Sequence, residues 1–300
     1  MNGSRRPLND PGRRHRHAEE GRARSPGPGG AGGAAAHGLL RGGRRARGQA
    51  DRVGDQRPRP GRAGHEDVRG PAGQQPDRGL LGGGARVSAT RVAVLRFPGT
   101  LDHQSAARAV QGVGAEPVFT HHEDTALPTG THAVVIPGGF SYGDHLRPGA
   151  LASRTPIMGA VKDHAKAGGK VLGICNGFQI LCESGLLPGV LRPNASLSFI
   201  CRQADLEVAD AGTPWTGGRG AGEVLSIPFK HHDGAWFGTP GEARVVLRYK
   251  GENPNGSIDK IAGISNLAGN VMGLMPHPEE AQEPLLGSTD GRVLFAALIA

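Results

Sequence analysis

The sequence predicts one α/β domain over residues 89–300, with a mostly parallel sheet flanked by helices. Two observations predict this fold class. Short apolar runs alternate with amphipathic segments in the first half of this region, which is the order expected of parallel strands joined by helices. In addition, about 210 residues suit a single α/β domain with one sizeable core.

Each element follows from its own local pattern. Apolar runs of strand length predict sheet strands over 91–97, 116–120, 133–136, 170–174 and 271–275. Amphipathic spacing predicts helices over 104–113, 157–167, 178–186 and 292–299. Three further runs, 206–208, 223–228 and 244–249, are interpreted as additional strands of antiparallel type.

Cys175 lies between a predicted strand and a predicted helix. The run 170–174 leads into a sharp turn that Gly177 closes, and a helical segment follows at once. A helix N-terminus favours a thiolate through its dipole and free N–H groups, and the thiolate is the nucleophilic form of cysteine. A strand–nucleophile–helix elbow therefore makes Cys175 a candidate for acyl chemistry. The alternative is a buried structural cysteine.

A second candidate group lies near the C-terminus. His277 stands between Pro276 and Pro278, whose fixed φ angles stiffen the segment, and Glu279 follows two positions after the histidine. In extended backbone, residues two apart project to the same side, so Glu279 can orient the imidazole of His277. This is the arrangement of a base and its orienting group. The alternative is a solvated histidine in a proline-rich turn.

Gly138 and Gly139 directly follow the predicted strand 133–136. Glycines at such a place let the backbone approach a ligand and aim its N–H groups at it. In acyl transfer, these groups can form an oxyanion hole. The alternative is an ordinary turn between a strand and a loop.

Together these segments resemble class I (triad) glutamine amidotransferases. Within that family they resemble the glutaminase subunits of phosphoribosylformylglycinamidine synthase, over roughly residues 91–300. The segments that carry the resemblance are 137–144 (PGGFSYGD), 173–181 (GICNGFQIL), 199–202 (FICR), 255–257 (NGS) and 275–279 (MPHPE).

The resemblance implies a flavodoxin-like three-layer sandwich and a Cys-His-Glu triad. Cys175 is then the nucleophile, His277 the proton carrier and Glu279 the group that orients His277. The resemblance places further residues at the oxyanion or glutamine site, namely Gly138, Gly139, Asn176, Gln179 and His231.

The resemblance also implies partners and a pathway. Glutamine is the substrate, and its ammonia passes to a large synthetase subunit (PurL) in a complex with a small subunit (PurS), in de novo purine biosynthesis. ATP and Mg²⁺ serve the large subunit, and this chain needs no cofactor or metal. Two alternatives remain open: the glutaminase of another amidotransferase complex or a related cysteine hydrolase, and a non-catalytic binding protein on the same fold.

Three segments depart from the family pattern. The loop 98–103 reads PGTLDH where the family has Pro-Gly-Ser/Thr-Asn-Cys-Asp, which leaves its role in doubt. The segment 231–234 reads HHDG instead of His-Gly-Glu-Gly, so Asp233 keeps a carboxylate but shortens it. Glu280 replaces the arginine that usually follows the triad glutamate.

The first 88 residues form a separate compositional region. They hold 18 of the 35 basic and 8 of the 27 acidic residues, a net charge of +10, which leaves residues 89–300 with 17 and 19, a net of −2. The segment lacks Phe, Tyr, Trp and Ile, so we expect it to be disordered. A nucleic-acid-binding tail and a targeting peptide are alternatives, but we favour a wrongly extended start, with Val87 as the true beginning.

The remaining composition excludes several classes of protein. Three cysteines without paired spacing predict a reducing, cytoplasmic compartment and no disulfide framework. No apolar run is long enough to span a membrane, and no spacing typical of zinc ligands occurs. Because the basic excess is confined to the first 88 residues, which lack aromatic residues for base stacking, we expect no nucleic-acid partner.

Overall fold

The computed structural model describes residues 90–239 and 241–300, so the predicted disordered extension, residues 1–88, lies outside the described residues. The described part contains a nine-stranded sheet with the strand order β2-β1-β3-β4-β11-β10-β9-β6-β7. Five of these strands form a parallel block: β2 (Glu116–His121), β1 (Arg91–Arg96), β3 (Thr131–Ile136), β4 (Lys170–Ile174) and β11 (Val271–Leu274).

The other four strands extend the same sheet with antiparallel pairing. They are β10 (Ile261–Ser265), β9 (Arg244–Tyr249), β6 (Ile200–Val208) and β7 (Val224–His231). A separate two-stranded sheet pairs β5 (Val190–Arg192) with β8 (Ala235–Phe237). The sheet therefore changes from parallel to antiparallel between β11 and β10.

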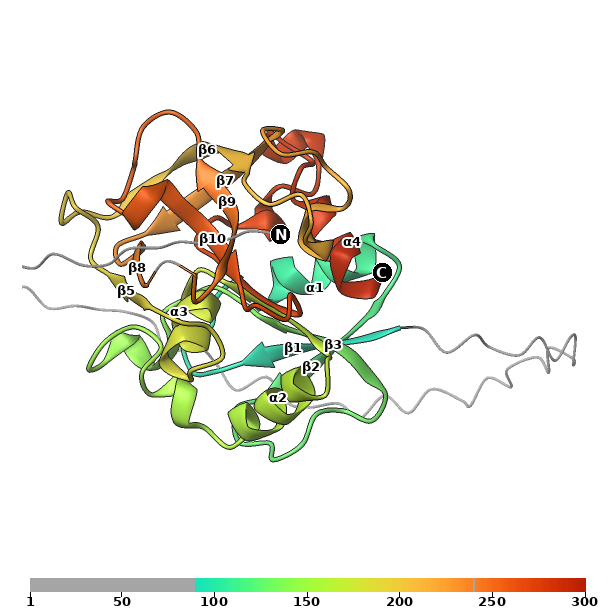
Figure 1. Cartoon of the computed structure of the whole chain (residues 1–300). Helices are drawn as coiled ribbons and strands as arrows, with labels where there is room; N and C mark the ends of the chain where they lie inside the picture. Colours follow the sequence, from blue (N-terminus) through green and yellow to red (C-terminus); the bar gives the residue numbers. More distant parts are fainter. Residues whose placement is uncertain (1–89, 240) are drawn as a thin grey trace, which may run out of the picture. The chain divides into compact units, whose positions relative to one another are not determined.

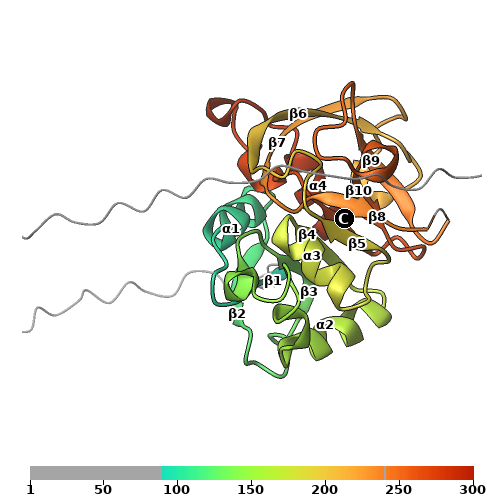
Figure 2. The same cartoon turned by 90° about the vertical axis from the view of Figure 1, so that its left-hand side faces the viewer.

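Four helices cover the two faces of the parallel block (Figures 1 and 2). Helix α1 (His103–Gly112) contacts α4 (Arg292–Ile299) on one face, whereas α2 (Ile157–Lys166) and α3 (Asn176–Glu183) cover the other. Strands with helices on both faces are shielded from water on both sides. This explains why β3 and β4 read as continuous apolar runs: Val134, Val135, Val171 and Leu172 are all fully buried.

These observations confirm the predicted α/β three-layer fold and its central parallel sheet. The predicted helix over 178–186 instead starts at Asn176 and ends at Glu183, because Gly185 takes a left-handed conformation (φ 76°) that terminates the helix. The sequence did not predict β10, whose segment IAGIS is short and rich in small residues. No helix in the described ranges is long and apolar enough to cross a membrane.

Glycines let α3 pack unusually close to the strands beneath it. A Cβ at Gly177 would lie 2.0 Å from the carbonyl oxygen of Ile136, and one at Gly173 would lie 2.7 Å from the carbonyl oxygen of Gly177. On the neighbouring strand, a Cβ at Gly273 would lie 2.1 Å from the ring of Phe178. These contacts fix the start of α3, and with it Cys175, against the end of the parallel block.

The close packing of α3 leads to a prediction about stability. Gly177→Ala should destabilise the fold by about 1–3 kcal/mol, because the added methyl group meets backbone that cannot move without shifting β3. Denaturant unfolding followed by circular dichroism measures the change.

A matched control is Gly159→Ala in α2, where an added Cβ meets nothing within 4 Å. That substitution should raise stability by roughly 0.5–1 kcal/mol, since alanine is the better helix former. Equal effects of the two substitutions would contradict the packing account.

Candidate active site

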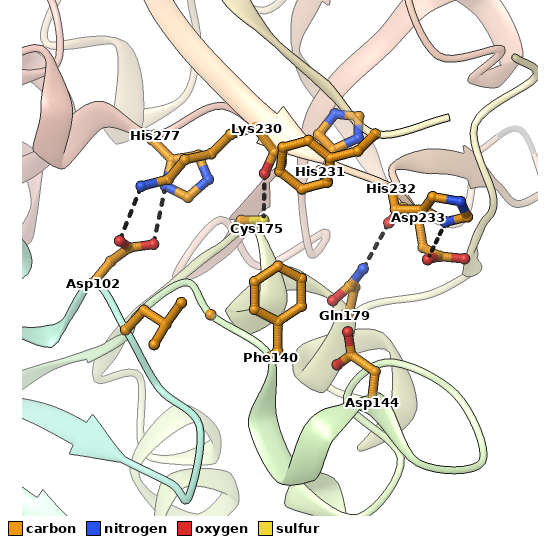
Figure 3. Close-up of a pocket in the computed structure, with 13 residues that line it drawn as sticks. Asp102, Phe140, Asp144, Cys175, Gln179, Lys230, His231, His232, Asp233 and His277 are labelled. Carbon is orange, nitrogen blue, oxygen red and sulfur yellow. Dashed lines mark hydrogen bonds and ion pairs between the residues drawn. The ribbon is translucent and has the colours of Figure 1, made fainter. Parts of the chain in front are cut away.

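Three parallel strands end side by side and deliver the predicted catalytic residues to one edge of the sheet. In the paired register, Ile136 of β3 lies beside Gly173 of β4, and Ile174 lies beside Leu274 of β11. The segments that follow these strands carry Gly138, Cys175 and His277. Parallel sheets place ligand sites at this edge. The predicted juxtaposition of the three segments is therefore present (Figure 3).

Cys175 lies at the sharp turn between strand and helix that the sequence predicted, and its backbone there is strained. Its φ angle of 51° is unusual for a residue other than glycine, and its N–H donates to the carbonyl of Leu274 at 2.8 Å. The residue is 6% exposed, and its thiol donates to the carbonyl oxygen of Lys230 at 3.6 Å. Strained backbone of this kind is found at functional sites when the surrounding contacts hold it in place.

His277 and Glu279 form a buried pair. Glu279 Oε1 lies 2.7 Å from His277 Nδ1, and both side chains are almost completely inaccessible to water. The backbone N–H of His277 donates to the carbonyl of Pro228 at 2.8 Å, which ties the segment to β7. The predicted placement of a carboxylate beside the imidazole two residues earlier is thus observed.

The environment of His277 favours its charged form. Burial alone would lower its pKa, but the negative charges of Glu279 and Cys175 outweigh burial and raise the pKa well above its ordinary value. Burial raises the pKa of Glu279, and the charge of His277 opposes that effect. The arrangement therefore stabilises an imidazolium at His277, between Glu279 and Cys175.

The proton on Nδ1 is fixed by the bond to Glu279, which leaves Nε2 for chemistry. Nε2 of His277 is buried, and it makes no hydrogen bond of normal geometry to any group in residues 90–239 or 241–300. The Cys175 thiol contributes to the raised pKa of His277, as expected for a group beside the ring. His277 can therefore exchange a proton between Cys175 and a substrate.

Two backbone N–H groups beside the thiol suit an oxyanion. Asn176 is the first residue of α3, where helical N–H groups have no partner within the helix. Among the described residues, neither the N–H of Asn176 nor that of Gly139 donates to another protein group. Gly139 lines the cavity with Cys175, whereas Gly138 is not among the lining residues. Gly138 lies against the His277 ring, since a Cβ there would lie 2.8 Å from His277 Cε1.

The side chains of Asn176 and Gln179 hold the surrounding loops. Asn176 Oδ1 accepts from the N–H of Ser141 at 3.1 Å, and its Nδ2 donates to Gln179 Oε1 at 2.8 Å. Gln179 Nε2 in turn donates to the carbonyl of Asp233 at 2.6 Å. Of these two residues, Gln179 also lines the cavity, and its place near glutamine stays a prediction.

His231 lines the same cavity and remains neutral. Burial, reinforced by the charge of His277, lowers its pKa to about 3. Its Nδ1 lies 3.0 Å from Asn194 Oδ1. A neutral imidazole in the lining can offer a hydrogen bond to a bound molecule without adding charge, and the role of His231 in binding glutamine stays a prediction.

The cavity also contains residues that the sequence reasoning did not assign to the site. It has a volume of about 110 Å³ and opens beside Cys175. The unassigned lining residues are Leu101, Asp102, Phe140, Asp144, Phe199, Lys230, His232 and Asp233. Asp102 could have been found, because the loop that carries it follows β1 at the same edge of the sheet. Nothing in the sequence around Lys230 pointed to the site, because Lys230 lies within a strand in which buried and partly exposed residues alternate.

Asp144 and Asp233 make one end of the cavity acidic. Burial, and next the charge of Asp233, raise the pKa of Asp144 to about 6. Asn176 Nδ2 lies 3.5 Å from Asp144 Oδ1. Asp233 Oδ2 lies 2.9 Å from His232 Nδ1 (Figure 3). A carboxyl group with a second carboxylate close by can accommodate a positively charged group.

Comparison with known proteins gives concordant results. The sequence model of the CobB/CobQ-like glutamine amidotransferase domain matches residues 89–290. The phosphoribosylformylglycinamidine synthase subunit PurQ of Bradyrhizobium diazoefficiens is 50% identical over 224 residues, which cover 69% of this chain and 96% of that protein. The protein of the same name from Rubrobacter xylanophilus is 49% identical over 217 residues, covering 70% and 98%.

Solved structures agree with the fold. A chain in the structure of PurLQS from Thermotoga maritima is 42% identical, with a TM-score of 0.67, and the match covers 70% of this chain and 98% of that one. A putative GMP synthase component from Thermoplasma acidophilum, 14% identical with a TM-score of 0.54, shares the fold alone; that match covers 70% and 92%. The match over residues 89–290, together with relatives half identical over nearly their whole length, shows that this chain belongs to the family of CobB/CobQ-like glutamine amidotransferase domains.

Proposed function

We propose that this chain is the glutaminase subunit of phosphoribosylformylglycinamidine synthase, a ligase that forms a carbon–nitrogen bond with glutamine as the nitrogen donor. The observation that carries the proposal is the buried Glu279–His277 pair, 2.7 Å apart, beside a strained cysteine at a helix N-terminus. The name shared by relatives about 50% identical supports the choice of reaction.

The first half of the reaction releases ammonia. The thiolate of Cys175 attacks the side-chain amide carbon of glutamine, and the carbonyl oxygen becomes an oxyanion. Backbone N–H groups of Gly139 and Asn176 donate to this oxygen. His277 then gives its Nε2 proton to the leaving nitrogen, the carbon–nitrogen bond breaks, and a γ-glutamyl thioester remains on Cys175.

The second half restores the enzyme. His277, now neutral, takes a proton from water, whose oxygen attacks the thioester carbon. The carbon–sulfur bond breaks, glutamate leaves, and Cys175 regains its thiolate form beside the imidazolium. Throughout both halves, Glu279 keeps the Nδ1 proton in place, which preserves the tautomer and the orientation of the ring.

The acidic end of the cavity accounts for recognition of an amino acid. Glutamine carries an α-ammonium group at the end opposite its reacting amide. Asp144 and Asp233 line the cavity with Cys175, and the proposal assigns the α-ammonium to them. Gln179 and His231 then lie along the neutral part of the substrate.

The rim of the cavity suits a protein partner. Leu101, Phe140 and Phe199 line it, and they remain 60%, 45% and 51% exposed. Grouped apolar side chains at a surface are typical of interaction sites. A large synthetase subunit seated there would receive ammonia without loss to water, with a small subunit completing the complex, in keeping with the three-part name of PurLQS.

The reaction also requires cofactors in the partner subunit and a supply of free glutamine. ATP and Mg²⁺ act in the large subunit, where they activate formylglycinamide ribonucleotide for attack by ammonia, and this chain uses neither. We place the complex in the cytoplasm, where de novo purine biosynthesis draws on free glutamine. The free thiols of Cys175, Cys182 and Cys201 agree with a reducing compartment.

Because this chain supplies only the ammonia, loss of its thiol should impair synthesis from glutamine and not synthesis from ammonia. Cys175→Ala should abolish glutamine-dependent synthesis by the assembled complex but leave synthesis from added ammonia intact, because only the donor step uses the thiolate. Measurement of amidine formation with each nitrogen source tests this.

Cys201→Ala is the matched control, because Cys201 is exposed on β6 and does not line the cavity. It should retain both activities. Loss of ammonia-dependent synthesis in Cys175→Ala, or full glutaminase activity without the thiol, would contradict the assignment.

Binding of the α-ammonium group predicts a pH dependence of KM. Because the pKa of Asp144 is raised to about 6, the carboxyl is mostly protonated below that pH and charged above it. The KM for glutamine should therefore fall as pH rises from about 5 to about 7. Asp144→Asn should remove this dependence and raise KM at neutral pH by roughly ten- to a hundredfold, the usual effect of losing a hydrogen bond to a charged group.

The control for this prediction is Asp163→Asn, which removes a carboxylate from the exposed face of α2. It should leave KM and its pH dependence unchanged. An unaltered KM in Asp144→Asn would show that the α-ammonium binds elsewhere.

A further inference from the structure

Asp102 occupies a capping position but does not cap. It is the residue before α1, where an aspartate usually accepts a hydrogen bond from an N–H of the first turn. Its side chain makes no such bond, and it is only 12% exposed. The carboxylate of Asp102 is therefore not used to cap α1 and is free to interact with other groups.

That carboxylate faces the catalytic imidazole. Asp102 Oδ2 lies 3.5 Å from His277 Nδ1, on the same nitrogen that Glu279 holds, and Asp102 Oδ1 lies 3.0 Å from Lys230 Nζ (Figure 3). Gly138 makes the approach possible, since a Cβ at that position would lie 2.5 Å from Asp102 Oδ2. The absence of a side chain at Gly138 therefore leaves room for the Asp102 carboxylate beside His277.

The loop that carries Asp102 is held firmly against the glycine loop of the site. The N–H groups of Leu101 and Asp102 both donate to the carbonyl of Gly138, at 3.1 and 3.2 Å. In return, the N–H of Phe140 donates to the carbonyl of Gly99 at 2.9 Å. These bonds fix Asp102 relative to the ring of His277, in the segment 98–103 that departs from the family pattern.

Lys230 joins this carboxylate to the nucleophile. Burial would lower the pKa of Lys230, but the bond to Asp102 and the nearby carboxylates raise it, so the ammonium stays charged. The carbonyl of the same residue accepts from the thiol of Cys175 at 3.6 Å. Glu280 Oε1 adds a second carboxylate, 3.7 Å from Lys230 Nζ.

A bound metal is the competing interpretation of this cluster. Asp102, His277 and Glu279 each offer a ligand atom, and these atoms lie within 4.8 Å of one another. However, Lys230 already places a positive charge 3.0 Å from Asp102 Oδ1. An ammonium at that distance repels a second cation, so the geometry favours an ion-pair network.

We propose that Asp102 is a positioning residue that, together with Glu279, holds the Nδ1 edge of the His277 ring. In the same network, Lys230 partly neutralises the negative charge of Asp102 and so reduces the effect of that charge on the imidazole. The inference rests on the proposed glutaminase function, because it concerns the base of that reaction. Charges of alternating sign then run from Glu279 through His277, Asp102 and Lys230 to Glu280.

The titration of His277 separates this role from a merely structural one. The charged or titratable groups around the ring are Glu279, Asp102, Cys175, His231 and Lys230, with Glu280 beyond Lys230. The readout is the pH midpoint of the His277 ring nitrogens, by NMR of the ¹⁵N-histidine-labelled chain, assigned by comparison with His277→Gln. This readout requires no glutamine and no partner.

Removal of the two charges should shift that midpoint in opposite directions. Asp102→Asn should lower it by about one unit, because the imidazolium loses a nearby carboxylate. Lys230→Met should raise it, because the charge of Asp102 is no longer balanced, and Lys230→Arg should restore the wild-type value. Glu116→Gln breaks a similarly short ion pair with Arg91, 3.1 Å, on strands β2 and β1, and should change nothing.

Kinetics of the assembled complex supply the second readout. Asp102→Asn should lower kcat for glutamine about tenfold with KM changed less than about twofold, because ring placement and not substrate binding is affected. The basic limb of the kcat profile should move in the same direction as the NMR midpoint. In the isolated chain, which lacks the Mg²⁺-dependent large subunit, added EDTA should not alter the pH midpoint of His277; a shift reversed by a divalent metal would favour the metal interpretation and overturn ours.

The outcomes keep the two proposals distinct. Unchanged midpoints in both Asp102→Asn and Lys230→Met would overturn the positioning role even if the complex is an active glutaminase. A wild-type complex without glutaminase activity would overturn the proposed function, while the NMR shifts would still report on the network. Should Asp102→Asn fail to fold, the upward shift in Lys230→Met decides the question alone.

Discussion

The parallel pairing of β3, β4 and β11 is the constraint on which the site depends. Its register places the ends of three strands together, so that the glycine loop, Cys175 and His277 emerge at one edge. The close packing of α3, which Gly177 permits, then sets the angle at which the chain turns through Cys175. Gly139, Cys175 and His277 lie far apart in sequence, yet each needs only to follow its own strand to arrive at the candidate site.

Burial gives the assembled groups their chemical properties. His277 and Glu279 are removed from water, so their mutual charge and hydrogen bond determine their protonation more strongly than they would at a surface. A buried charge requires partners, and the loss of one partner leaves the other uncompensated. The chain supplies them on both sides: Glu279 from the same turn, and the Asp102–Lys230 pair from the start of α1 and from β7. The site is therefore an extended network rather than three isolated residues.

The sequence predicted the parts of this site that depend on local order. Cys175, His277 and Glu279 could be found because a strand-like run precedes the first two, and because the carboxylate stands two residues from the imidazole. The pairing of Lys230 with Asp102 spans 128 residues and depends on how β7 folds over the parallel block, which no local pattern encodes. The hydrogen bond between His231 and Asn194, which are 37 residues apart, could not be predicted from the sequence for the same reason. Strand β10 was missed because its small residues give no clear alternation.

The central claim is that Cys175 is the nucleophile of a glutamine-specific site, and covalent labelling tests it most directly. The assembled complex would be treated with an alkylating glutamine analogue, with and without excess glutamine, and the modified peptides identified by mass spectrometry. The account predicts a label on Cys175 that glutamine prevents, and none on the exposed Cys201, which serves as an internal control for general thiol reactivity. Labelling of Cys201 but not Cys175, or labelling of Cys175 that glutamine does not prevent, would contradict it.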